Sequence, residues 1–66
     1  MDQQSKEDLE ATIDLYGLKA VLTALSEICG AKAEHVSTNW QDMRMARAWR
    51  TAEGRLGVMA TQVEVL

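Results

Sequence analysis

Two runs of apolar residues, each repeating at steps of three and four, constrain the fold of this chain more than any other feature. The first run, which admits one lysine, is Leu18, Leu22, Leu25, Cys29, Lys32 and Val36. The second is Trp49, Ala52, Leu56, Met59, Val63 and Leu66. Residues at these spacings share one face of an α-helix, so two such helices can pack along their lengths. Because residues 37–42 between them are rich in turn-forming Ser, Thr, Asn and Asp, the chain is predicted to be all-α with a long antiparallel hairpin.

We expect a short first helix before the hairpin, which gives three helices over about residues 5–16, 18–37 and 42–65. A flexible tail of residues 1–4 would precede a single domain of residues 5–66. Ser5, with Asp8 three residues later, is typical of a helix start. Asp42 is a suitable cap for the third helix. The absence of proline favours helix throughout.

Gly17 decides how the first helix joins the second. In one unbroken helix, the apolar face of Leu9, Ile13 and Tyr16 would lie about 180° from the face that begins at Leu18. A bend at Gly17 would turn both faces toward a common core, and glycine tolerates such a bend. We therefore favour a break, with the first helix on one flank of the second and the third helix on the other. The alternative, one long helix, would require a partner chain.

The apolar surface is large for a chain of 66 residues that has a single cysteine and so no internal disulfide. Such a chain buries only about 60% of its unfolded surface. The apolar face of the second helix is widened by Val21, Ala24, Ile28 and Ala31. Met43, Val58 and Val65 add apolar surface to the third helix. Either the first helix folds back over this surface or the surface is an interface. We expect a helical-bundle homodimer.

Two glycines lie inside the predicted third helix. Gly57 shares one side of the helix with Ala46 and Ala60, which predicts close approach of a neighbouring helix. The alternative is a kink at Gly54, since each glycine costs about 1 kcal/mol relative to alanine in a helix interior.

Charge is segregated along the chain. Residues 1–42 carry three lysines against eight acids, whereas residues 43–66 carry four arginines against two acids. The four arginines lie opposite the apolar stripe of the third helix: Arg44, Arg47, Arg50 and Arg55. They are a solvated face, a surface that pairs with the acidic first helix of this or another chain, or a binding site for an acidic partner.

The aromatic residues extend this candidate surface. Trp49 lies on the apolar stripe and is expected in the core. Trp40, beside the turn, either locks the hairpin or anchors a partner. The candidate partner-binding residues are Arg44, Arg47, Arg50, Trp40, Met43 and Arg55.

No catalytic site is expected. Cys29 and His35 are about 240° apart around a helix and cannot form a nucleophile–base pair within it. We expect Cys29 in the core, and His35 with Glu34, Asn39 and Asp42 in hydrogen bonds that shape the turn. The sequence predicts neither a cofactor nor a metal site. Its acidic, polar start and lone thiol favour a cytoplasmic protein without a membrane span.

The segments Lys-Ala-Glu-His at 32–35 and Asn-Trp-Gln-Asp at 39–42, with Ala46 and Trp49, resemble short uncharacterised bacterial and phage open reading frames. The resemblance covers residues 18–50, and these motifs are not specific to any activity. In its small size and acidic composition, this chain also resembles the mobile-element proteins that inhibit host defence, anti-CRISPR proteins among them. That likeness assigns no role to individual residues.

These features together predict a non-enzymatic interaction or inhibitor protein that docks on another protein. Arg44, Arg47, Arg50 and Trp40 are expected at the rim of that contact. The alternative is a nucleic-acid-binding module that uses the same arginines. The net charge of −3 weighs against this alternative, because phosphate neutralisation supplies most nucleic-acid affinity.

Overall fold

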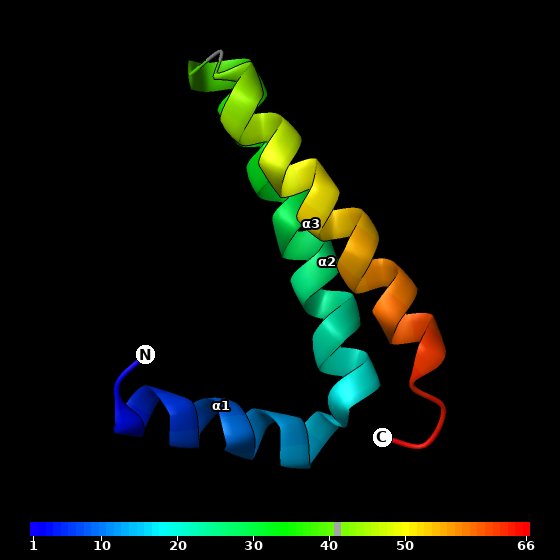
Figure 1. Ribbon diagram of the computed structural model, residues 1–66. Helices are drawn as coiled ribbons and strands as arrows, with labels where there is room; N and C mark the ends of the chain where they lie inside the picture. The colour runs from blue at the N-terminus through cyan, green and yellow to red at the C-terminus, as the bar shows by residue number, and fades with distance from the viewer. Residues whose placement is uncertain (41) are drawn as a thin grey trace.

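The described part of the chain is mainly helical, with no strand in residues 1–40 and 42–66. A computed structural model describes these residues, apart from the side chain of Trp40. The elements are α1 (Gln3–Tyr16), α2 (Leu18–His35), the π-helical turn η1 (Val36–Trp40) and α3 (Met43–Gln62). Helices α2 and α3 lie side by side and antiparallel, and α1 extends away from them (Figure 1). The predicted all-α class and the hairpin are confirmed.

Helix α1 begins earlier than expected. Asp2 is its N-cap, and its carboxylate accepts a hydrogen bond of 2.7 Å from the backbone N–H of Ser5. This bond lowers the pKa of Asp2 below its ordinary value of 3.8. Ser5 is therefore the residue that is capped, not the cap itself. Consequently, Gln3 and Gln4 belong to the helix and not to a flexible tail.

The predicted break at Gly17 is present. Gly17 has φ 90° and ψ 152°, a conformation that favours glycine, and its N–H donates to the carbonyl of Ile13 at 2.7 Å. The expectation that α1 folds back along α2 is wrong, because α1 contains no buried residue. A one-residue connection is shorter than the 2–8 residues that usually join packed antiparallel helices, so the chain turns only part of the way.

The hairpin packs along a seam of small residues. Gly30 and Ala33 of α2 are buried, as are Ala46 and Ala60 of α3. A Cβ added to Gly57 would lie 3.5 Å from Ser26 Oγ, an ordinary contact across the seam. The close approach predicted at Gly57 is confirmed, and α3 runs unbroken through Gly54.

Because small residues occupy the seam, the two predicted apolar stripes lie partly at its edges. In the first stripe Leu22, Cys29 and Val36 are buried. In the second, Trp49, Ala52, Leu56 and Val63 are half-buried. Each stripe thus correctly marks a side of its helix, but the line of closest contact is displaced toward the alanines and glycines.

The polar turn is more helical than expected. The α-helix ends at His35, and the backbone continues as a π-helix to Trp40. Thr38 Oγ1 donates to the carbonyl of Glu34 at 2.7 Å, and Asn39 Nδ2 donates to that of His35 at 3.1 Å. These polar side chains bond back four residues, to carbonyls at the end of α2, while the backbone stays helical instead of ending there.

Helix α3 starts as predicted and ends early. Asp42 caps it, and its carboxylate accepts from the N–H of Met45 at 3.1 Å. The helix ends at Gln62, short of the expected residue 65. The last residues turn back toward the start of α2, where the N–H of Leu18 donates to the carbonyl of Leu66 (Figure 1).

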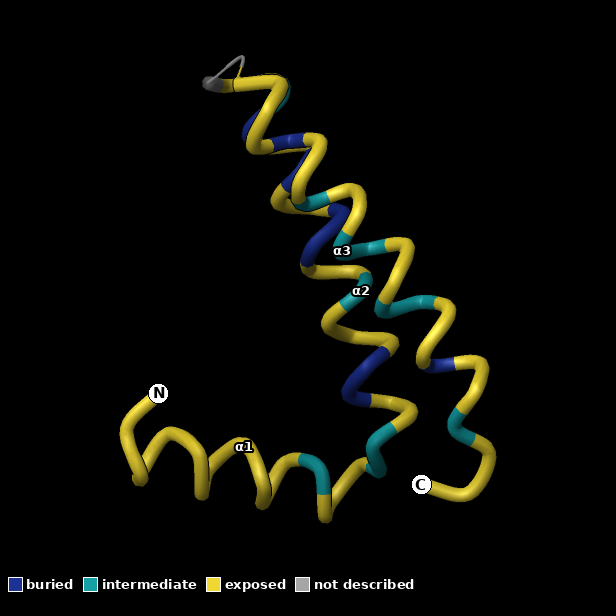
Figure 2. Tube along the Cα trace, viewed as in Figure 1, coloured by how far each residue is buried: buried dark blue, intermediate teal, exposed yellow. Residues whose placement is uncertain are grey.

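The molecule is flat. It measures 37 × 28 × 13 Å, so its thickness is less than half of either other dimension. Buried residues follow the line where α2 faces α3, and α1 is exposed along almost its whole length (Figure 2). This arrangement leaves broad faces of the helices open.

Candidate interaction surfaces

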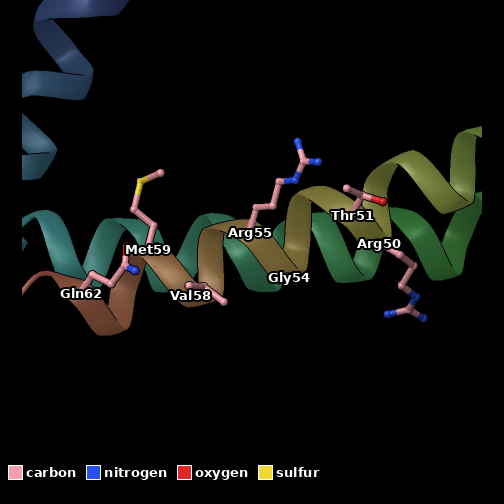
Figure 3. A pocket seen from close by; sticks show the side chains of 7 residues that line it. All are labelled: Arg50, Thr51, Gly54, Arg55, Val58, Met59 and Gln62. Carbon is pink, nitrogen blue, oxygen red and sulfur yellow. The ribbon is translucent and has the colours of Figure 1, made fainter.

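The arginine surface, defined here as Arg44, Arg47, Arg50 and Arg55, extends along α3 from its outer side to the edge of its contact with α2. All four residues are exposed. They span 12 residues of helix, and the distance along the axis from the first to the last is about 17 Å. Figure 3 shows that Arg55 projects to one side of α3, together with Met59, while Arg50 projects to the other. The surface is therefore a broad arc and not a single converging cluster.

Arg50 is paired within its own helix. Its Nη1 lies 3.1 Å from Oε1 of Glu53, and the two side chains are 55% and 36% exposed. It is the one ion pair among the residues that the structure describes, so α1 makes no such pair with the arginine surface there. Contact between the arginines and the first helix of the same chain, one of the three alternatives, is not what the fold produces.

Shallow hollows adjoin the arginine surface. One, of about 500 Å³, follows the outside of α3 past Gly54, where a Cβ would have no neighbour within 4 Å (Figure 3). Another, of about 240 Å³, lies beside Met43 and is also lined by Arg47 and Arg50. Met43 is 58% exposed and thus accessible to a partner. The side chain of Trp40 lies outside the description, so its expected role remains a prediction.

An apolar groove at the α1–α2 junction was not among the sequence-predicted sites. This elbow groove has a volume of about 430 Å³. Its apolar side chains come from both helices: Leu9, Tyr16, Ala20, Val21, Ala24, Leu25 and Ile28. The sequence signal for this groove was the set of apolar residues that widens the face of α2, at positions 21, 24, 28 and 31. Sequence periodicity could not show that α1 would leave that stripe open.

A second hollow adjoins the groove along the hairpin. It has a volume of about 600 Å³, shares Ile28 with the groove and extends to Met45 and Trp49. Lys32 Nζ lies 5.6 Å from the centre of the Trp49 ring, within cation–π range. Trp49 therefore sits at the edge of the hairpin under a lysine, and not in the centre of a core as expected.

Cys29 and His35 do not form a site together. Cys29 is buried, whereas His35 is exposed and its Nδ1 lies 3.1 Å from Asn39 Nδ2. The predicted role of His35 and Asn39 in shaping the turn is thus confirmed. Within residues 1–40 and 42–66, no three His, Cys, Asp or Glu side chains gather as metal ligands would. Over the same residues, no helix combines the length and apolar character needed to cross a membrane.

Comparisons with protein-family models, curated proteins and solved structures yield no match to this chain.

Proposed function

We propose that this chain is a non-enzymatic interaction protein that docks on another protein through the arginine surface of α3 and inhibits it. We further propose that it acts in the cytoplasm as a homodimer and regulates host machinery for a phage or mobile element. The single observation that carries the docking proposal is the exposure of all four arginines on one helix, beside the accessible Met43.

Arginine suits this role because its planar guanidinium binds carboxylates in a two-pronged geometry. Arg44 and Arg47 lie outside the Arg50–Glu53 ion pair and are adjacent on α3. Met43 offers an apolar contact next to them. A partner with an acidic rim around a small apolar patch is the chemistry that this surface fits.

The test is the double substitution Arg44→Glu, Arg47→Glu. A photo-crosslinker at Met43 would first identify the bound protein in an extract of the host, and calorimetric titration would then measure its affinity for the purified chain. We expect the double variant to lose binding while its helicity by circular dichroism is unchanged. Unaltered affinity would remove the proposal.

A matched control separates the surface from net charge. Lys6→Glu, Lys19→Glu changes the charge by the same amount on exposed residues of α1 and α2. This control variant should bind as the unmodified chain does. Equal loss in both variants would mean that overall charge, and not the arginine surface, governs the interaction.

The four arginines spread along about 17 Å of α3 also favour a second candidate, nucleic-acid binding. A salt titration distinguishes the two. Affinity for nucleic acid should fall steeply and linearly with the logarithm of salt concentration, with a slope near the number of phosphates neutralised. A protein contact with an apolar centre should weaken much less.

A further inference from the structure

The flat shape leaves this chain without a second layer. Protein domains bury their apolar faces between at least two packed layers, but this molecule measures only 13 Å in its thinnest direction. A compact folded chain of 7.3 kDa exposes about 4,200 Å². This chain exposes 5258 Å². The excess, about 1,100 Å², is more than the roughly 800 Å² that each partner buries in a standard interface.

Helix α1 is the part of the chain that most needs a partner. It has 14 residues, and none of them is buried. An isolated helix of that length is only marginally stable in water. The apolar residues Leu9, Ile13 and Tyr16 nevertheless follow one face of it.

The elbow groove has the chemistry of a helix-binding surface. Its α2 wall, which includes Val21, Leu25 and Ile28, contributes no acid. It also lacks the charged groups that often fix a small ligand, since the side-chain polar groups among its lining residues are the hydroxyls of Thr12 and Tyr16. Lys32 lines the hollow that adjoins the groove beyond Ile28.

Helix α1 matches this groove in length and charge. Its 14 residues span about 21 Å, and the open face of α2 from Ala20 to Lys32 spans about 18 Å. Helix α1 carries four acids and one lysine, whereas the α2 residues that line the groove and the adjoining hollow include Lys32 and no acid. The α1 of the same chain cannot lie along this face, because the one-residue connection at Gly17 holds it at an angle.

We propose that α1 of a second copy of this chain occupies the elbow groove, and that the exchange is reciprocal in a two-fold symmetric dimer. The groove is built from both α1 and α2, so a two-fold axis through it places each α1 on the other copy's α2, as a self-complementary interface requires. The inference rests on the homodimer within the proposed function and names the interface. It leaves the arginine surface of α3 free.

The test is the mass of the full chain in solution, by sedimentation equilibrium between about 1 µM and about 1 mM. The unmodified chain should have twice the monomer mass of 7.3 kDa. Ile28→Lys, at a residue 51% exposed, should raise the dimer dissociation constant by about 100-fold or more, because it removes an apolar contact and would bury a charged side chain among apolar ones. Ile13→Lys should do the same from the α1 side.

Val58→Lys is the matched control, since Val58 is 58% exposed but lies on the outside of α3. This variant should remain dimeric. Circular dichroism checks that each variant is folded, and Ala24→Lys, at another exposed groove position, replaces Ile28→Lys if that chain unfolds.

Three outcomes would overturn the proposal. A monomeric mass at every concentration would show that a second copy of the chain does not occupy the elbow groove. Loss of the dimer in Ile28→Lys but not in Ile13→Lys would exclude α1 as the occupant. Equal loss in Val58→Lys would place the interface elsewhere. None of these outcomes depends on binding through the arginine surface, so that proposal stands or falls separately.

Discussion

The carboxylate of Glu53 on α3 lies against the backbone of Gly30 on α2, in space that the Cβ of any other residue would occupy. The same carboxylate binds Arg50, and the carbonyl of Glu53 accepts a hydrogen bond of 2.8 Å from Ser26 Oγ. One residue of α3 thus connects the two helices at the middle of the hairpin, and it does so because α2 has a glycine opposite.

We predict that Gly30→Ala changes the stability of the hairpin by less than about 0.5 kcal/mol, because the cost of displacing the Glu53 carboxylate from the Arg50 ion pair offsets the helix preference of alanine. In a Glu53→Ala background the same change should stabilise by about 0.5–1 kcal/mol, the helix preference of alanine over glycine. Urea denaturation of the four chains gives the coupling free energy. An equal effect in both backgrounds would contradict the contact.

Gly54→Ala should stabilise the protein by up to about 1 kcal/mol, since a Cβ there meets nothing within 4 Å. Gly57→Ala should also stabilise it, because its Cβ would be in ordinary contact with Ser26 Oγ at 3.5 Å. The midpoint of urea unfolding measures both changes. Loss of stability in Gly57→Ala would show that the helices are closer than the structure has them.

Gly17→Ala should destabilise the junction of α1 and α2 by about 1–2 kcal/mol, because φ is +90° there and L-residues avoid that region. The added Cβ would also lie 2.9 Å from the carbonyl oxygen of Leu66. Thermal unfolding followed by circular dichroism tests this prediction. The same substitution at Gly54, where φ is helical, is the control.

The start of α1 should depend on pH through Asp2. Its pKa is lowered in the folded chain by the hydrogen bonds from Ser5, so the stabilisation is present above the ordinary value of 3.8 and is lost as pH falls through the lower folded value. The amide resonance of Ser5 should report this fraying by NMR. Asp2→Asn keeps a capping side chain without the titration, so its Ser5 resonance should not respond in that pH range.

The arginine surface could be predicted from the sequence, whereas the elbow groove could not. The arginines of α3 are exposed as their angular spacing indicated, because helix periodicity alone determines which residues share a face. The elbow groove was not predicted as a site. Its existence depends on the direction in which α1 leaves Gly17, and that direction has no signature in periodicity.

By itself, the sequence determined the three helices, the break at Gly17, the cap at Asp42 and the close approach at Gly57. These features follow from spacing, capping chemistry and side-chain size, which act over a few residues. Only the tertiary structure decided that small residues form the seam, that Glu53 lies over Gly30 and that α1 stands apart from the hairpin. Those outcomes depend on contacts between residues distant in the chain, such as Leu18 with Leu66, which no local pattern contains.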